Sequence, residues 1–199
     1  MKALLLKDAY QMKAYCKSML LVVGAFGVVS LFSQDNPFFF FYPILMMGLL
    51  PVSLLSYDER SHWNEFCGCL PVSKGTIVGE KYLLGLLLVV PTAAVLTAFR
   101  GLGAAISGNF VLTDLTQLSG LTLASGLLSI ELCMPFFFKF GVEKGRIVYY
   151  VAICVFCAAC FAVKTLPPLP TLAPPAVLAA AAIGYAVSWE MSVKMYGVK

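Results

Sequence analysis

The strongest constraint on this chain is a series of long apolar runs separated by short polar segments. A helix that crosses the hydrocarbon core of a bilayer needs about 20 mostly apolar residues. We therefore predict an all-α polytopic membrane protein with six transmembrane helices, which together form one domain over residues 1–199. The six expected helices cover residues 18–33, 37–56, 81–99, 115–138, 147–163 and 172–189.

The composition excludes several other classes of protein. Apolar residues make up 60% of the 199 residues and charged residues 12%, against about 45–50% and about 25% in soluble domains. A soluble domain of this length keeps too much of its surface in water to bury so many apolar side chains. We therefore exclude an ordinary soluble enzyme, a disordered tail and a nucleic-acid-binding module. The net charge of +4 does not by itself indicate a nucleic-acid partner.

The distribution of basic residues tests the count of six spans independently. Lys and Arg are enriched in the short cytoplasmic loops of membrane proteins. With six spans and a cytoplasmic N-terminus, only Arg100 and Lys164 of the 14 Lys and Arg residues lie outside. We therefore predict that both termini are cytoplasmic. The residues expected on the cytoplasmic side are Lys2, Lys7, Lys13, Lys17, Arg60, Lys74, Lys81, Lys139, Lys144, Arg146, Lys194 and Lys199.

Residues 1–17 are expected to form an amphipathic helix on the cytoplasmic membrane surface. Leu5, Ala9, Met12 and Cys16 recur at helical spacing, while charged residues occupy other positions around the helix. Such a helix can lie in the interface with its apolar side in the lipid. The alternative is a basic leader segment without regular structure.

The only long polar stretch, residues 57–80, lies between the second and third expected spans and contains a short helix pattern. Trp63, Phe66, Cys67 and Leu70 fall on one stripe of a helix. A helix with this stripe can lie on the membrane surface or can dock into a groove of a cytoplasmic partner. The sequence pattern alone leaves both interpretations open.

The ends of this short helix are marked by charged residues and by a proline. Asp58, Glu59 and Arg60 are expected to head the helix, because acids near an N-terminus favour the helix dipole. Pro71 is expected to end it, because the residue before a proline is displaced from helical geometry. Ser73 is then a suitable N-cap for a helix that continues into the third span.

Residue types that usually carry catalysis or bind metals are poorly grouped. Cys154, Cys157 and Cys160 are spaced three apart within one expected span, but we interpret them as small apolar packing residues. His62 is the only histidine and lies in the polar loop, away from any recognisable catalytic set. No phosphate-binding loop of the G-x-x-x-x-G-K-[ST] type occurs. We therefore predict no catalytic, metal or cofactor site in this chain, and any energy-driven work needs a partner.

One acidic residue is expected inside the membrane. Glu131 lies eight residues before Lys139, which places it roughly 12 Å from the cytoplasmic boundary. An ionisable group at that depth is unfavourable and is often functional. Glu131 is therefore a candidate residue of a translocation path, and a satisfied contact between helices is the alternative. Pro135 is expected to kink the same helix, and Pro51 and Pro91 to kink the second and third spans.

Three segments carry a resemblance to a known family. They are Tyr57-Asp58-Glu59, Trp63, Leu70-Pro71-Val72-Ser73, Ile77-Val78 and Lys81-Tyr82 in the loop; Met1 to Asp8; and Lys139-Phe140-Gly141 with Glu143 to Arg146. With these segments the chain resembles the compact bacterial ABC exporter permeases of the second type, similar to the permeases that export phenol-soluble modulins or bacteriocins. The short, proline-rich segment between Lys164 and Pro175 departs from that family.

The resemblance implies a transport subunit, not an enzyme, in the bacterial plasma membrane. In such exporters, two permease chains, identical or different, pair with two separate cytoplasmic ATPases that bind ATP and Mg. Residues 1–17 would then be an interfacial elbow helix, and the 57–80 loop would carry the coupling helix that contacts the ATPase. The residues expected at this contact are Asp58, Glu59, Arg60, Trp63, Phe66, Leu70 and Pro71.

The cargo and the alternative functions follow from the same features. The apolar spans suit amphipathic peptides or lipid-like and antimicrobial compounds, and the export direction rests on the resemblance. The alternative function is an ion-gradient-driven secondary transporter or a channel. That class usually needs more intramembrane ionisable residues or an internal repeat, and Glu131 is the only such residue expected.

Overall fold

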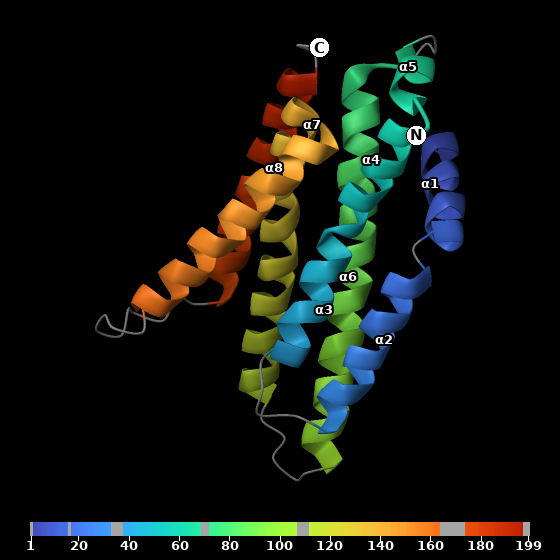
Figure 1. Cartoon of the computed structure of the whole chain (residues 1–199). Helices are drawn as coiled ribbons and strands as arrows, with labels where there is room; N and C mark the ends of the chain where they lie inside the picture. Colours follow the sequence, from blue (N-terminus) through green and yellow to red (C-terminus); the bar gives the residue numbers. More distant parts are fainter. Residues whose placement is uncertain are drawn as a thin grey trace.

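The computed structural model describes residues 2–15, 17–32, 38–68, 72–106, 112–163 and 174–196. Within these ranges the secondary structure is entirely helical, without a strand (Figure 1). The helices are α1 (Lys2–Tyr15), α2 (Lys17–Phe32), α3 (Phe38–Gly48), α4 (Leu50–Arg60), α5 (Trp63–Gly68), α6 (Lys74–Ile106), α7 (Leu112–Val163) and α8 (Pro174–Tyr196).

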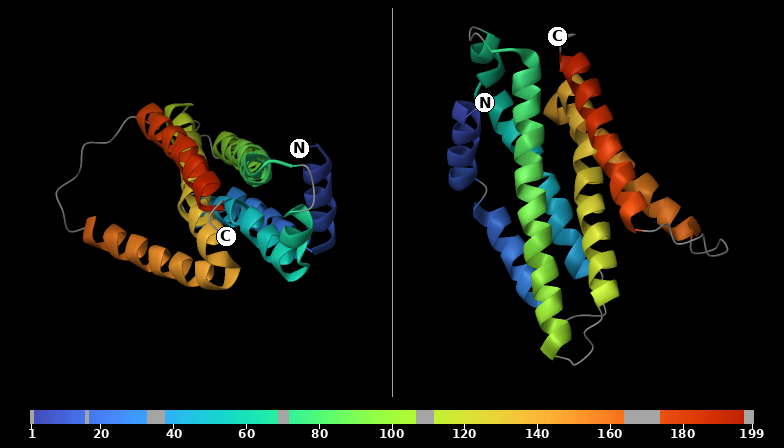
Figure 2. Two further views of the ribbon diagram at one scale, coloured as in Figure 1. Left: turned by 90° about the horizontal axis from the view of Figure 1, so that it is seen from above. Right: turned by 180° about the vertical axis from the view of Figure 1, so that it is seen from behind.

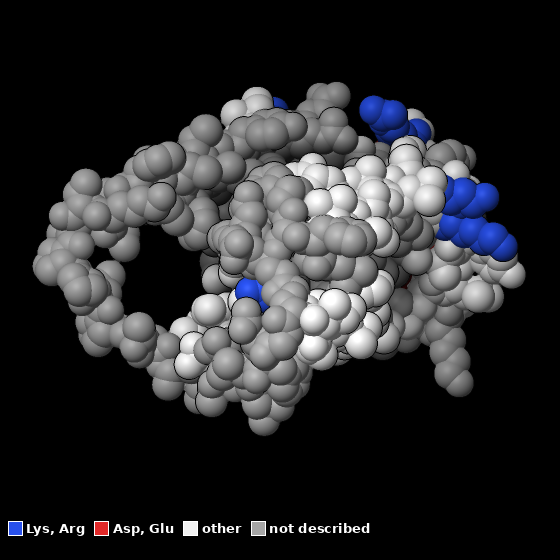
Figure 3. All heavy atoms as spheres, turned by 90° about the horizontal axis from the view of Figure 1, so that it is seen from below, with Lys and Arg blue, Asp and Glu red and all other residues white. Residues whose placement is uncertain are grey.

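The long helices run side by side along a common direction and form a bundle (Figure 1). Helices α1 and α5 and the C-terminal end of α8 lie at one end of this bundle. The second half of α7 turns back at that end and diverges from the other helices, as the view from above shows (Figure 2). Seen from the opposite end, the described atoms are mostly uncharged, and basic atoms gather mainly at one edge (Figure 3).

Four helical segments among the described residues are long and apolar enough to cross a membrane. They are Phe41–Arg60, Lys74–Ile106, Leu115–Val142 and Ala176–Tyr196. They overlap the second, third, fourth and sixth expected spans. Helix α2 coincides with the first expected span but has only 16 residues, and the fifth expected span lies in the second half of α7. The count of six spans therefore stays a prediction.

The core of the bundle lies where α3, α6 and α7 meet. Ile44, Val89, Ile130 and Met134 are fully buried there. Gly126 allows this close contact, because a Cβ atom at this position would lie only 2.6 Å from Val89 Cγ1. Lipid tails are as apolar as these side chains, so close packing and not the hydrophobic effect holds helices together in a bilayer.

Pro51, Pro91 and Pro135 are expected to bend their spans, and Pro91 lies inside α6. The second expected span is divided at Leu49 into α3 and α4, and Pro51 lies in the first turn of α4. A proline is well tolerated there, because the backbone N–H that it lacks would have no partner within the helix. Pro135, in contrast, lies inside α7, and the backbone leaves helical geometry only at Gly141, with φ 78° and ψ 173°. Gly141 lies between the fourth and fifth expected spans, 115–138 and 147–163, so α7 changes direction where the sequence predicts their connection. The kink expected at Pro135 stays a prediction.

The restart of the chain after the polar loop agrees with the sequence pattern. Helix α6 begins at Lys74, seven residues before the expected start of the third span. Ser73 caps it, because the Thr76 backbone N–H donates to Ser73 Oγ at 3.3 Å. Helix α6 therefore continues without a break from the third expected span into the polar segment 57–80.

Candidate functional site

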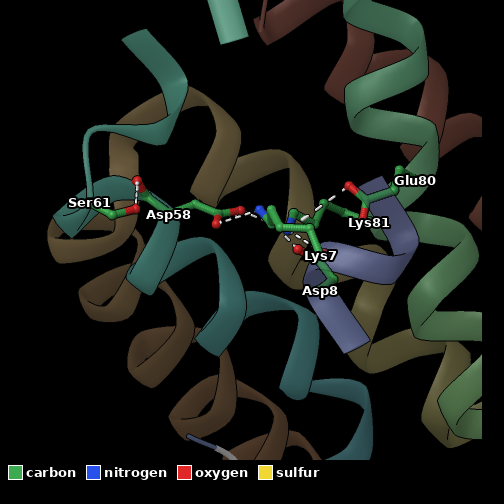
Figure 4. Close-up of polar contacts among 6 residues, drawn as sticks. All are labelled: Lys7, Asp8, Asp58, Ser61, Glu80 and Lys81. Atoms are coloured by element: carbon green, nitrogen blue, oxygen red, sulfur yellow. Dashed lines mark hydrogen bonds and ion pairs between the residues drawn. The ribbon is translucent and has the colours of Figure 1, made fainter. Parts of the chain in front are cut away.

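A buried group of charged side chains joins three helices at the end of the bundle that carries α5. We call Lys7 and Asp8 of α1, Asp58 of α4, and Glu80 and Lys81 of α6 the ionic cluster (Figure 4). Asp8 is fully buried, and Asp58, Glu80 and Lys81 are each 2% exposed. Buried charges are tolerated only when they are paired, so the pairing within this cluster decides whether the three helices stay together.

The two lysines and two of the acids form a closed ring of ion pairs. Lys81 Nζ lies 2.5 Å from Asp8 Oδ2 and 2.8 Å from Asp58 Oδ2. Lys7 Nζ lies 2.6 Å from Asp58 Oδ1 and 3.0 Å from Asp8 Oδ1. Each aspartate is therefore bridged by both lysines. Such mutual pairing offsets the desolvation of the four groups, and the loss of any one group would leave others unpaired.

Glu80 adds a third acid beside the two lysines. Its Oε2 lies 4.0 Å from Lys81 Nζ, and its Oε1 is buried with no hydrogen-bond partner among the described residues. Burial alone raises the pKa of Asp8, but the interactions with Glu80, Lys81 and Lys7 outweigh it and hold the pKa below its ordinary value.

The ionic cluster also contacts the short helix α5. Lys7 Nζ lies over the Trp63 ring, 4.5 Å from its centroid, which is a cation–π geometry. The Trp63 and Phe66 rings are 5.4 Å apart, Cys67 is buried, and Phe66 is 57% exposed. Helix α5 thus faces the ionic cluster with Trp63 and presents Phe66 outward.

The charged residues expected to head α5 belong to another helix. Asp58, Glu59 and Arg60 form the last turn of α4, and α5 begins at Trp63 after a turn at Ser61 and His62. The expectation is therefore wrong for this boundary. The physical reason is that Lys7 and Lys81 bind the Asp58 carboxylate, which keeps this residue on the helical face directed at α1 and α6. Leu70 and Pro71 lie outside the described residues.

Glu59 and Arg60 differ in their surroundings. The Glu59 Oε2 atom accepts a hydrogen bond from the Val142 backbone N–H at 2.8 Å, which links the end of α4 to the bend of α7. Arg60 is exposed at the end of α4. Of the residues predicted for the ATPase contact, the structure therefore brings Asp58 and Trp63 together through Lys7 and directs Glu59 to α7.

Glu131 lies in the contact between α7 and α8. A Cβ atom on Gly184 of α8 would overlap Glu131 Oε2, so the carboxyl group lies directly against the bare backbone of α8. Its Oε1 atom is buried and has no hydrogen-bond partner among the described residues. The structure therefore places Glu131 between two helices.

Next to Glu131, four hydroxyl groups join α6 and α8. Ser188 donates to the Glu131 carbonyl oxygen at 2.9 Å. The Tyr82 hydroxyl lies 2.8 Å from Ser188 Oγ and 2.7 Å from Ser192 Oγ, and Tyr185 donates to the Tyr82 carbonyl oxygen at 2.6 Å. We call Tyr82, Tyr185, Ser188 and Ser192 the hydroxyl network. It satisfies polar groups inside the bundle without introducing a charge.

The sequence interpretation missed the inward direction of Asp8. In the expected helix, Asp8 was assigned to the polar side and Ala9 to the apolar side, yet Asp8 is fully buried and Ala9 is exposed. A signal was present, because Asp8 is three residues from Leu5 and four from Met12, and both pack against a buried cluster of the bundle. An acid in the middle of an apolar stripe predicts a buried basic partner, and Lys81 is that partner.

These features define a helical membrane protein whose charged groups are concentrated at one end. The sequence matches the family described as ABC-2 family transporter protein over residues 3–197. The chain belongs to this family, whose members are membrane-embedded permease subunits of ABC transporters and generally work with a separate ATPase. Searches of curated proteins and of solved structures gave no match.

Proposed function

We propose that this chain is the permease subunit of an ATP-driven exporter in the bacterial plasma membrane. It would form the translocation path with a second permease chain and would be driven by separate cytoplasmic ATPases that bind ATP and Mg. In this proposal α5 is the coupling helix that contacts the ATPase, and α1 is the interfacial elbow helix. Family membership supports the permease role.

The ionic cluster is the observation that carries this proposal. Phe66 is exposed, and the neighbouring Trp63 ring contacts Lys7. Lys7 pairs with Asp58, and Lys81 joins the same carboxylate to the long helix α6. A push on α5 would therefore reach α1 and α6 through short, buried contacts instead of through a compliant loop.

The arrangement of charges supports six spans with cytoplasmic termini. The ionic cluster, α5 and the C-terminal end of α8 lie at the same end of the bundle (Figure 1). The expected cytoplasmic loops and termini carry most of the basic residues of the chain, as the cytoplasmic side of a membrane protein should. We therefore assign this end to the cytoplasm.

For the cargo we propose an amphipathic peptide or a lipid-like or antimicrobial compound. Glu131 would contribute to the path, because its Oε1 atom has no protein donor among the described residues and can bind a basic group of the cargo. Intramembrane acids of this kind commonly mark substrate or ion pathways. The exposed apolar side chains of the spans suit the rest of an amphipathic molecule.

The coupling role of α5 is tested by co-purification with an ABC ATPase subunit, for which an adjacent reading frame that encodes a Walker motif is the first candidate. Phe66→Asp places a charge on the outward side of α5, and we expect it to abolish recovery of the complex from detergent. Ser73→Asp is the matched control, because it adds the same charge to the same loop and retains a side chain that caps α6. Undiminished recovery with Phe66→Asp contradicts the coupling-helix assignment. ATP-independent transport by the chain alone would favour an ion-gradient-driven transporter or channel.

A further inference from the structure

The bend of α7 creates a second helix start inside one long helix. At Gly141 the backbone has φ 78° and ψ 173°, a region that is essentially restricted to glycine. Helical geometry resumes after it and continues to Val163. The first backbone N–H groups of a helix have no partner within that helix, so the segment 142–163 needs acceptors from elsewhere.

Glu59 supplies one of these acceptors from a distant part of the chain. Its Oε2 atom accepts the Val142 N–H at 2.8 Å, across a separation of 83 residues. A carboxylate at this position also interacts favourably with the positive end of the helix dipole. Glu59 approaches so closely that a Cβ atom on Gly141 would lie 2.8 Å from its Oε1 atom. The glycine therefore serves both the backbone bend and the approach of the carboxylate.

The turn that carries Glu59 is fixed at its other side by the ionic cluster. The neighbouring residue Asp58 pairs with both Lys7 and Lys81. The Ser61 hydroxyl donates to the Asp58 carbonyl oxygen at 3.2 Å and closes the turn. Two successive acids at the end of α4 thus point to different partners, Asp58 to α1 and α6, and Glu59 to α7.

We propose that Glu59 is a positioning residue that caps the helix segment 142–163 from the end of α4. Through this cap the last turn of α4, and with it α5, moves together with the second half of α7. The cap itself follows from the contacts of this chain, while the source of the movement rests on the proposed coupling function. The segment 142–163 contains the fifth expected span, so the cap would carry the motion of the coupling helix to that span.

The cap is tested on the full-length chain alone by hydrogen–deuterium exchange. In Glu59→Ala we expect the peptide that contains Val142 to exchange roughly three- to tenfold faster, the factor for loss of a typical helix cap. Glu59→Gln keeps an acceptor and should lie between Glu59→Ala and the unmodified chain. Arg60→Ala is the matched control in the same turn. Unchanged exchange in Glu59→Ala, with the exchange of α6 also unchanged, overturns the proposal.

Joint movement is tested in the complex with the ATPase. We expect ATP binding to change the exchange of the peptide that contains Val142. We expect this change to be absent in Glu59→Ala when complexes with equal amounts of bound ATPase are compared. If the unmodified complex shows no ATP-dependent change at this peptide, the joint movement is wrong. If no ATPase is recovered with the unmodified chain, the proposed coupling function fails, and the exchange measurement on the chain alone still decides whether Glu59 is a cap.

Discussion

Two polar networks flank α6, and they provide partners for buried polar groups in different ways. Glu80 and Lys81 face α1 and α4 in the ionic cluster. Tyr82, the next residue, faces α8 in the hydroxyl network. The ionic cluster holds full charges that neutralise one another, whereas the hydroxyl network holds neutral groups that share hydrogen bonds. We infer that the ionic cluster depends on each of its members and that the hydroxyl network tolerates single losses.

The two networks differ in what the loss of one member leaves behind. Four of the five members of the ionic cluster are almost completely buried, so a missing partner leaves a charge without compensation. In the hydroxyl network a missing hydroxyl leaves neutral groups that can rebond to backbone carbonyl groups, as Thr92 does with Leu88. The ionic cluster therefore suits a contact between helices that is either fully formed or fully broken. The hydroxyl network suits helices that stay in contact.

The largest effect is expected from Lys81→Met, which removes the amine shared by Asp8 and Asp58. Loss of one partner of a buried pair typically lowers the free energy of unfolding by about 3–5 kcal/mol. The measurement is denaturation of the purified chain in detergent, with Lys74→Met at an exposed position of α6 as the control. The double variant Lys81→Met/Asp8→Asn should be less destabilised than the sum of its parts, and strict additivity would contradict a shared ion pair.

Gly184→Ala is expected to have the next largest effect, because the added methyl group would overlap the Glu131 carboxyl group. Overpacking of this kind typically destabilises by about 1–3 kcal/mol. Gly24→Ala is the matched control, since a Cβ atom there would meet no atom within 4 Å. The same denaturation assay should show that Glu131→Ala relieves most of the loss caused by Gly184→Ala. A loss that persists in the double variant would mean that Glu131 does not occupy this contact.

A smaller effect is expected from Tyr82→Phe, which removes the central hydroxyl of the hydroxyl network. Hydrogen bonds between membrane helices contribute about 0.6 kcal/mol on average and about 1.7 kcal/mol at most. The loss of stability should fall in this range, with Tyr10→Phe at an exposed position as the control. A loss as large as that of Lys81→Met would remove the distinction between the two networks.

The helices and the cap at Ser73 could be predicted from the sequence, because apolar runs and capping residues are local signals. The contacts of Asp8 and Glu59 could not be predicted in the same way. Asp8 pairs with a residue 73 positions away, and Glu59 with one 83 positions away. A stripe on one helix shows which side is apolar, but it does not show which other helix brings a compensating charge.

The bend of α7 shows a similar limit. The sequence predicts a connection between the fourth and fifth spans over residues 139–146, and the backbone departs from helical geometry at Gly141 within it. The glycine was visible in the sequence, but its role depends on an external carboxylate that caps the helix after it. The exact residue at which the helix breaks, and the cap that follows it, therefore required the position of Glu59.

The smallest effect near neutral pH is expected from the titration of Asp8. The pKa of Asp8 is lower in the folded chain than its ordinary value of 3.8, so its ionised form favours folding. This contribution is fully present above about pH 5 and is lost as the pH falls through 3.8 toward the lower pKa of the folded chain. Denaturation midpoints measured between about pH 7 and about pH 3 should therefore decrease at the acidic end.

Asp8→Asn separates this titration from the general effect of acid. The variant should be less stable than the unmodified chain at pH 7, because Lys81 and Lys7 each lose a charged partner. Its stability should then fall less steeply in the acidic range, since the group with the lowered pKa is absent. Parallel acid profiles of the two chains would show that Asp8 carries no extra stabilising charge, and the ionic cluster would then be held together through Asp58 alone.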